Sequence, residues 1–169
     1  VNHASNVTGT IQDMEAIGRA VGGLPLLADV TQTAGSVPVH PERMNIALLA
    51  FTGHKSLYGP TGIGGLYIRE DQDLAPLKQG GTGTRSEDPE MPADLPHRYE
   101  SGTLNMLGIA GLRGGLRFLE KVSMEAVRGH ELLLMERLMS GFRYREWIRV
   151  HGPGTPEGRN GTLSLRLHG

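Results

Sequence analysis

The sequence contains no cysteine, and this absence excludes several kinds of site from its 169 residues. Without thiols the chain holds no disulfide framework, no thiolate metal site and no cysteine nucleophile. Its longest apolar run, Ile46 to Phe51, is far shorter than the roughly 20 residues that cross a bilayer. No charged segment followed by an apolar stretch opens the chain, so it shows no secretory signal and we expect a cytoplasmic protein.

The sequence also lacks a charge excess of either sign. Its 17 lysines and arginines almost balance its 18 aspartates and glutamates. Nothing therefore favours nucleic acid or an anionic membrane as a partner. A small-molecule ligand or a protein partner remains, and the 25 glycines, gathered in turns and loops, suit backbone that approaches a ligand.

Short apolar runs alternate with an amphipathic segment in the first 70 residues, which predicts an α/β fold. Asp13 is a plausible N-cap for a helix that ends at Gly22 and Gly23. The buried face of this helix is expected to carry Met14, Ile17, Ala20 and Val21. Strands are expected at 24–30, 44–52 and 63–70, the first two without alternation and therefore covered on both faces.

The second half begins with a polar stretch, 71–102, whose length is typical of a functional or mobile loop. A helix is expected from Leu104 to Glu120. Ser123 caps a further helix whose single apolar face is predicted to carry Val127, Leu134, Leu138 and Phe142. Strands expected at 147–152 and 161–169 begin a second, smaller domain.

Lys55 lies in "AFTGHKSLYGPTGIGG", between an apolar run and a glycine-rich stretch. A phosphate-binding P-loop requires its lysine directly after the second glycine, but His54 intervenes, and Leu48 stands where the first glycine belongs. A dinucleotide-binding fingerprint fails because Tyr67 stands where the third glycine is needed. Neither nucleotide motif accounts for the lysine.

Two interpretations of Lys55 remain: an ordinary solvated side chain, as most lysines are, or a lysine that forms a Schiff base with pyridoxal phosphate. The second requires a carboxylate for the pyridine nitrogen and donors for the phosphate. Asp29 ends the preceding apolar run. If the two strands are parallel neighbours, Asp29 and Lys55 reach the same edge of the sheet; alone, Asp29 equally suits a turn or a helix cap.

Four segments in order, "HASNVTG", "ADVTQTAG", "FTGHKSLYGPTGIGGLYIR" and "RYESGTLN", resemble the class V aminotransferase family of fold-type I pyridoxal phosphate enzymes. The resemblance is closest to the cysteine desulfurase and selenocysteine lyase branch. It implies a three-layer α/β/α large domain with a mostly parallel sheet, followed by a small α+β domain. Residues 1–121 correspond to the second half of the large domain, and 122–169 to the connecting helix and a truncated start of the small domain.

The resemblance implies roles for residues around Lys55, which matches the Schiff-base lysine. Asp29 matches the partner of the pyridinium nitrogen. Gln32 matches the residue that hydrogen-bonds the cofactor's phenolic oxygen. Thr52 and His54 match side-chain donors to the phosphate.

Three further matches lie outside the segments around Asp29 and Lys55. Asn6 matches an asparagine near the phenolic oxygen and the substrate carboxylate. Thr103 matches a residue that reaches the phosphate site of the partner subunit, which implies a homodimer with shared active sites. The segment "GGTGTRSE" matches an active-site loop near the dimer interface.

Taken singly, these residues have simpler interpretations. His54 suits a turn, and Gln32 and Asn6 suit an exposed surface. Thr103 suits the N-cap of the helix expected at Leu104. "GGTGTRSE" suits a flexible turn.

The resemblance implies removal of sulfur or selenium from cysteine or selenocysteine to give alanine, with an amino acid substrate and a sulfur-acceptor protein as partners. In this family the nucleophilic cysteine and the carboxylate-binding arginine follow the matched region. The phosphate-binding loop and the ring-stacking histidine precede it, so His3 is not that histidine. The chain starts at Val1, and we expect an internal piece of a longer protein. The alternatives are a class V aminotransferase for small amino acids and a non-catalytic remnant that serves as a dimerisation module.

Overall fold

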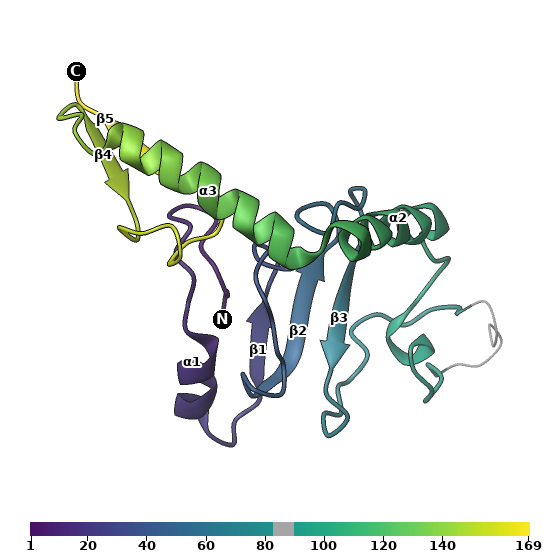
Figure 1. Cartoon of the computed structure of the whole chain (residues 1–169). Helices are drawn as coiled ribbons and strands as arrows, with labels where there is room; N and C mark the ends of the chain where they lie inside the picture. Colours follow the sequence, from purple (N-terminus) through teal and green to yellow (C-terminus); the bar gives the residue numbers. More distant parts are fainter. Residues whose placement is uncertain (83–89) are drawn as a thin grey trace.

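The computed structural model describes residues 1–82 and 90–169. Its central sheet has the order β1 (Leu26–Asp29), β2 (Ile46–Thr52) and β3 (Gly64–Ile68) (Figure 1). β1 and β2 are parallel, whereas β3 is antiparallel to β2. The extended N-terminal residues run parallel to β1 on its other side, with Asn2 bridged to Asp29. The predicted α/β architecture and all three strands of this region are confirmed.

Helix α1 (Met14–Val21) begins and ends where the sequence predicts. Its N-cap Asp13 accepts a hydrogen bond from the backbone N–H of Ala16 at 2.9 Å. Gly18 approaches the segment before β2 so closely that an added Cβ would lie 2.1 Å from the carbonyl oxygen of Met44. Ala20 is exposed, so its predicted burial is wrong. Ala20 comes two residues after Gly18, and the helix turns by about 200° over that distance, so Ala20 points away from the contact.

The core lies between α1, the segment 30–44 and one face of the sheet. It consists of buried apolar side chains: Met14, Leu26, Ala28, Val30, Met44, Ile46 and Leu49. Leu27, on the opposite face of β1, is 47% exposed. The prediction that this strand is covered on both faces is therefore wrong for the chain described, because α1 and the segment 30–44 cover one face only.

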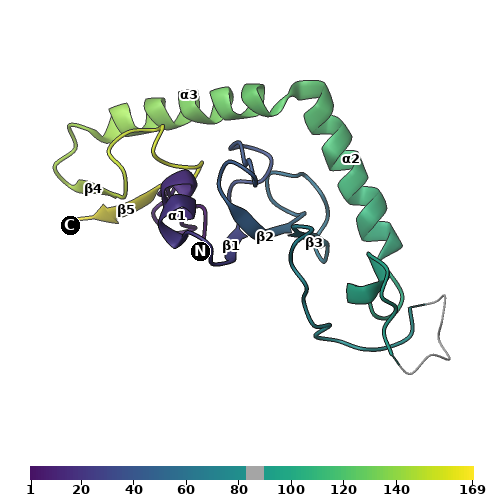
Figure 2. The same ribbon diagram turned by 90° about the horizontal axis from the view of Figure 1, so that it is seen from below.

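After β3, the described parts of the stretch 71–102 contain one short 3-10 helix, η1 (His97–Tyr99), and no strand. The chain then forms α2 (Met106–Val122) and α3 (Met124–Phe142), which join at Ser123 in a left-handed backbone conformation, φ 72°. The two helices form a bent pair beyond the carboxyl ends of β1 and β2 (Figures 1 and 2). Both helices were predicted, with α2 displaced by two residues.

The chain ends in a two-stranded antiparallel hairpin, β4 (Ile148–His151) and β5 (Ser164–Leu167), beside the far end of α3. The loop between these strands returns to the N-terminal region, where Arg159 bridges Thr10. Among the helices of residues 1–82 and 90–169, none combines the length and the apolar character needed to cross a membrane.

Candidate active site

Asp29 and Lys55 reach the same edge of the sheet, as the sequence predicts. Asp29 is the last residue of β1, and it is registered with Ala50 on the parallel strand β2. Lys55 follows β2 by three residues, in a turn closed by a hydrogen bond from the N–H of Tyr58 to the Lys55 carbonyl. The parallel pairing therefore brings a carboxylate and a primary amine to adjacent strand ends.

The side chain of Lys55 lines a polar cavity of about 290 Å³. Its walls come from the turn after β1, the turn after β2, α3 and the loop before β5: Gln32, Ser36, Lys55, Ser56, Tyr58, Glu131, Asn160, Gly161 and Thr162. Within the described residues, the Lys55 amine has no hydrogen-bond or ion-pair partner. The amine is thus available to react with a ligand in this cavity.

Thr52 and His54, on either side of Gly53, form a hydrogen-bonded pair. The Thr52 hydroxyl donates to the carbonyl of Ile63 at 3.4 Å, and its oxygen lies 2.7 Å from Nδ1 of His54. The direction of the hydrogen bond between Thr52 and His54 follows the imidazole tautomer, because a neutral Nδ1 either donates or accepts. His54 is exposed, and the pair offers a hydroxyl and an imidazole to an anion at this edge.

Asp29 and Gln32 belong to one tight turn after β1. The carboxylate oxygen Oδ1 of Asp29 accepts the N–H of Thr31 at 2.9 Å, which orients the exposed side chain. Gln32, one residue further on, lines the cavity of Lys55. The structure therefore places Gln32 beside Lys55, whereas Asp29 lies on the rim outside the cavity lining.

Asn6 lies in a loop after the N-terminal extended segment. Because that segment runs parallel to β1, Asn6 also follows it at the carboxyl edge of the sheet. Ser5 closes the loop by accepting the N–H groups of Val7 and Thr8 at 3.1 Å each. The Asn6 side chain is exposed and does not line the cavity.

Thr103 is exposed and lies apart from the Lys55 cavity. Its alternative interpretation as an N-cap is wrong: Asn105 caps α2, with Oδ1 accepting the N–H of Gly108 at 2.9 Å. Asn105 also donates to the carbonyl of Gly62 at 3.1 Å, which ties this segment to the loop after β2. Of the segment "GGTGTRSE", residues 83–87 lie outside the described residues.

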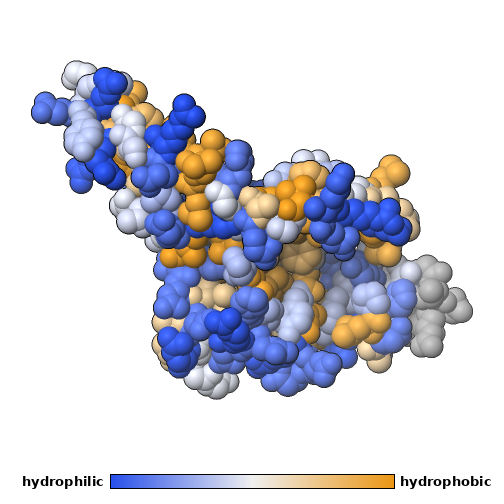
Figure 3. All heavy atoms as spheres, viewed as in Figure 1, coloured by the Kyte–Doolittle hydropathy of each residue, from blue (hydrophilic) through white to orange (hydrophobic). Residues whose placement is uncertain are grey.

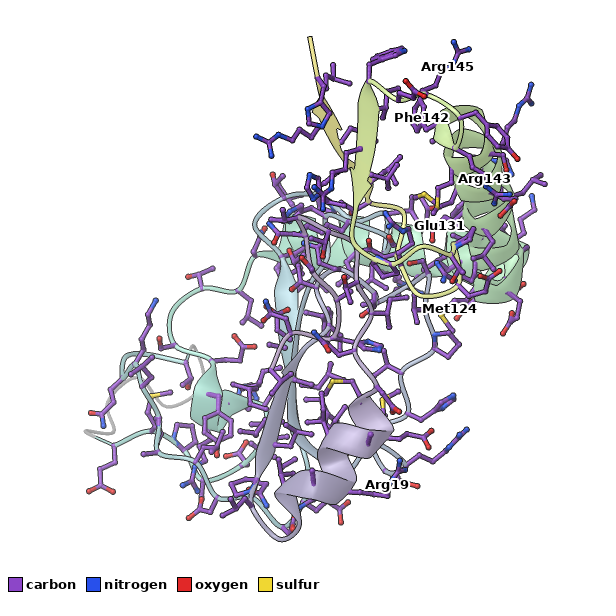
Figure 4. The ribbon with its side chains drawn as sticks, turned by 90° about the vertical axis from the view of Figure 1, so that its left-hand side faces the viewer. Arg19, Met124, Glu131, Phe142, Arg143 and Arg145 are labelled. Carbon is purple, nitrogen blue, oxygen red and sulfur yellow. The ribbon has the colours of Figure 1, made fainter. Side chains whose placement is uncertain are left out.

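Sequence reasoning missed the contributions of α3 and of the loop before β5. Glu131 of α3 lies beside that loop (Figure 4) and is paired with Arg128 at 3.6 Å. Asn160 lies in the loop before β5 and is only 4% exposed. The only local signal was the turn sequence "GRNG", which indicates a bend but not which strand ends it meets.

Comparison with known proteins identifies the family. The family model described as "Aminotransferase class-V" matches residues 1–169. A probable cysteine desulfurase of Pyrococcus abyssi is 34% identical over 176 aligned residues, covering 99% of this chain and 43% of the relative. A probable cysteine desulfurase of Aeropyrum pernix is 37% identical over 182 residues, covering 99% of this chain and 44% of the relative.

Solved structures agree with the sequence relatives. The apo structure of a cysteine desulfurase from Thermococcus onnurineus is 31% identical to the chain and superposes with a TM-score of 0.87. The match covers 100% of this chain and 44% of that one, so the chain spans less than half of the proteins it resembles. The fold is that of fold-type I enzymes, with mixed α/β architecture. The chain belongs to the class-V aminotransferase family.

Proposed function

We propose that this chain is part of a pyridoxal phosphate-dependent cysteine desulfurase. The observation that carries the proposal is the placement of Lys55 and Asp29 at one edge of the sheet, on the ends of adjacent parallel strands. The relatives indicate the substrate, because those that are about one third identical to this chain are named probable cysteine desulfurases.

The chemistry of the side chains at this edge fits pyridoxal phosphate. A primary amine (Lys55) suits an aldehyde, a carboxylate (Asp29) suits a protonated ring nitrogen, and the Thr52–His54 pair suits a phosphate. Gln32 and Asn6 offer amides to the phenolic oxygen. When bound, the cofactor supplies the electron sink, and Asp29 keeps its ring nitrogen protonated.

The chain's own residues then perform two tasks. Lys55 holds the cofactor covalently, and once released its amine moves a proton at the α-carbon of the substrate. The Thr52–His54 pair would hold the phosphate of the cofactor by donating hydrogen bonds to its oxygens. Cleavage of the carbon–sulfur bond of cysteine yields alanine and leaves the sulfur with an acceptor thiol.

The proposal extends to groups beyond these 169 residues. The nucleophilic cysteine and the arginine for the substrate carboxylate lie in the remainder of the protein. Two copies share each site, with Thr103 serving the partner's phosphate, and a sulfur-acceptor protein takes the product. Residues 1–121 belong to the cofactor domain and 122–169 to the connecting helix and the small domain.

The test is product formation by the full-length natural protein. With cysteine and a thiol reductant, it should release sulfide and alanine in equal amounts and show the visible absorbance band of a lysine-bound pyridoxal group. Lys55→Ala should remove the band and the activity, and Lys55→Arg, which keeps the charge, should not restore them.

The alternatives give different results. Amino-group transfer without sulfide release would replace the desulfurase by a class V aminotransferase. A folded full-length protein without a visible band would identify a non-catalytic member of the family.

A further inference from the structure

Asn160 connects the hairpin β4–β5 to both loops that carry predicted cofactor ligands. Its backbone N–H donates to the carbonyl of Gly9 at 2.9 Å, in the loop that contains Asn6. Its side-chain amide donates to the carbonyl of Gln32, 128 positions away, at 3.4 Å. Its Oδ1 accepts the N–H of Thr162 at 3.1 Å. One buried residue thus links its own loop to two segments that are distant in sequence, to Gln32 through its side chain and to Gly9 through its backbone.

The packing at Gly9 shows that the two loops are in direct contact. Gly9 has φ +74°, and a Cβ added there would lie 2.4 Å from the carbonyl oxygen of Thr162 and 3.1 Å from Oδ1 of Asn160. No side chain fits between the loops without displacing one of them. The position of the Asn6 loop therefore depends on that of residues 159–162.

Arg159 fixes the loop on which Asn160 lies. Its guanidinium is fully buried and donates to the backbone carbonyls of His151, Pro153 and Thr162. Burial lowers the pKa of this guanidinium below its usual value. Because a buried arginine held by carbonyls has little freedom, Asn160 is attached to a rigid support and transmits the position of the hairpin to the strand ends.

Asn160 and Gln32 also line the cavity that contains Lys55. We propose that Asn160 is a positioning residue, whose side-chain amide sets the Gln32 turn relative to Lys55 by holding the carbonyl of Gln32, while its backbone N–H ties Gly9 of the Asn6 loop to the same support. The proposal rests on the proposed function in one respect, namely that Gln32 and Asn6 face the cofactor. It concerns the chain's own residues and holds whether the substrate is cysteine or another amino acid.

The first test uses Asn160→Ala and Asn160→Ser in the cofactor-loaded full-length protein. Both variants are neutral, and neither side chain reaches the Gln32 carbonyl. If Gln32 loses its alignment, its hydrogen bond to the anionic phenolic oxygen weakens. The pH at which the visible absorbance band has lost half of its intensity should then rise by about 0.5 unit. The dissociation constant of the cofactor should increase about fivefold. Asn160→Ser carries the test if Asn160→Ala fails to fold.

A matched control is Asn45→Ala, at the amino end of β2. The Asn45 amide donates to the carbonyls of Gly18 and Gly22, so its loss weakens the scaffold by a similar set of contacts away from the site. This variant should unfold more easily but keep the wild-type pH midpoint. An equal shift in Asn45→Ala, or no shift in either Asn160 variant, would overturn the positioning role.

The second test does not depend on the cofactor. Amide hydrogen exchange in the cofactor-free protein should become about fivefold faster across 31–37 in Asn160→Ser, because the turn loses the hydrogen bond that holds its carbonyl. Unchanged exchange would reject the link from Asn160 to Gln32. A protein that binds no pyridoxal phosphate but shows faster exchange would reject the proposed function and retain the positioning of the turn.

Discussion

Gly35, in the turn after β1, leaves no space for a side chain next to the lysine turn. Its φ is +96°, and an added Cβ would lie 2.1 Å from the carbonyl oxygen of Ser56, the residue after Lys55. Gly35→Ala must therefore displace the turn that carries Lys55. We expect it to lower the free energy of unfolding by about 3 kcal/mol and to weaken cofactor binding at least tenfold.

Gly22→Ala provides the matched control for this prediction. Gly22 also has a positive φ, +60°, but an added Cβ would meet nothing within 4 Å. Its substitution should cost about 2 kcal/mol of backbone strain and leave cofactor binding unchanged. Urea unfolding and cofactor titration of both variants separate the two effects. Equal losses in both would show that the contact with Ser56 is not what matters.

The burial of His3 is expected to make the stability of the fold depend on pH. It is buried, its Nδ1 lies 2.9 Å from the hydroxyl of Thr33, and burial lowers the pKa of its imidazole below 6.5. The unfolded chain therefore binds a proton more readily than the folded one. The stability that neutral His3 contributes is fully present above about pH 6.5 and is lost as the pH falls towards its lowered pKa.

The measurement compares the urea midpoint of the wild type with that of His3→Gln at pH 8 and pH 5.5. Glutamine cannot titrate, so its midpoint should fall less over this interval than the wild-type midpoint. Parallel falls in the two proteins would show that His3 does not contribute to the acid sensitivity.

At the scale of elements, Asn105 performs two separable functions at the start of α2. Its Oδ1 caps the helix, and its amide nitrogen holds the carbonyl of Gly62. Asn105→Ala should lower the free energy of unfolding by about 1.5 kcal/mol, while Asn105→Asp keeps the cap and should lose only about 0.5 kcal/mol. Chemical denaturation measures both, and equal losses would mean that the link to Gly62 dominates.

The elements themselves follow from local sequence patterns, which explains why they could be predicted. Asp13 and Ser123 cap their helices as expected, and the apolar runs before Asp29 and Thr52 are parallel neighbours. These features depend on residues close together in the chain. The edge that carries Asp29 and Lys55 follows from them.

Long-range contacts were not accessible in this way. The bond from Asn160 to Gln32 joins residues 128 positions apart, and no local pattern encodes it. The exposure of Ala20 depends on where Gly18 meets Met44. Thr103 and Asn105 are both good capping residues, and the position of Gly62 favours Asn105. Tertiary packing decides such cases.

At the scale of the whole molecule, large apolar side chains remain exposed along the α2–α3 pair. Figure 3 shows them gathered over both helices, and Leu107 of α2 is 87% exposed. Apolar surface of this extent is typical of a face that is covered by other protein. Because the chain spans less than half of its relatives' length, the rest of the protein and a partner subunit are both able to cover this face. In the proposed homodimer, Thr103, just before α2, reaches the partner's site.

A complementation experiment tests the shared site. Consider a dimer of one Lys55→Ala subunit and one Thr103→Asp subunit. If each site combines Lys55 of one subunit with Thr103 of the other, one site carries both substitutions and the other site has an intact lysine and threonine. The aspartate is chosen because its charge repels a phosphate. Each variant alone should be nearly inactive.

Equal co-expression should produce mixed dimers as about half of the population, each with one intact site of two, and should therefore restore about a quarter of the wild-type activity. If Thr103 instead serves the site of its own subunit, every site in the mixed dimer carries one defect and activity stays at the level of the single variants. Mixing Lys55→Ala with His54→Ala is the matched control. Both side chains lie in one turn and serve one site, so sharing across subunits cannot separate them and this mixture should restore nothing.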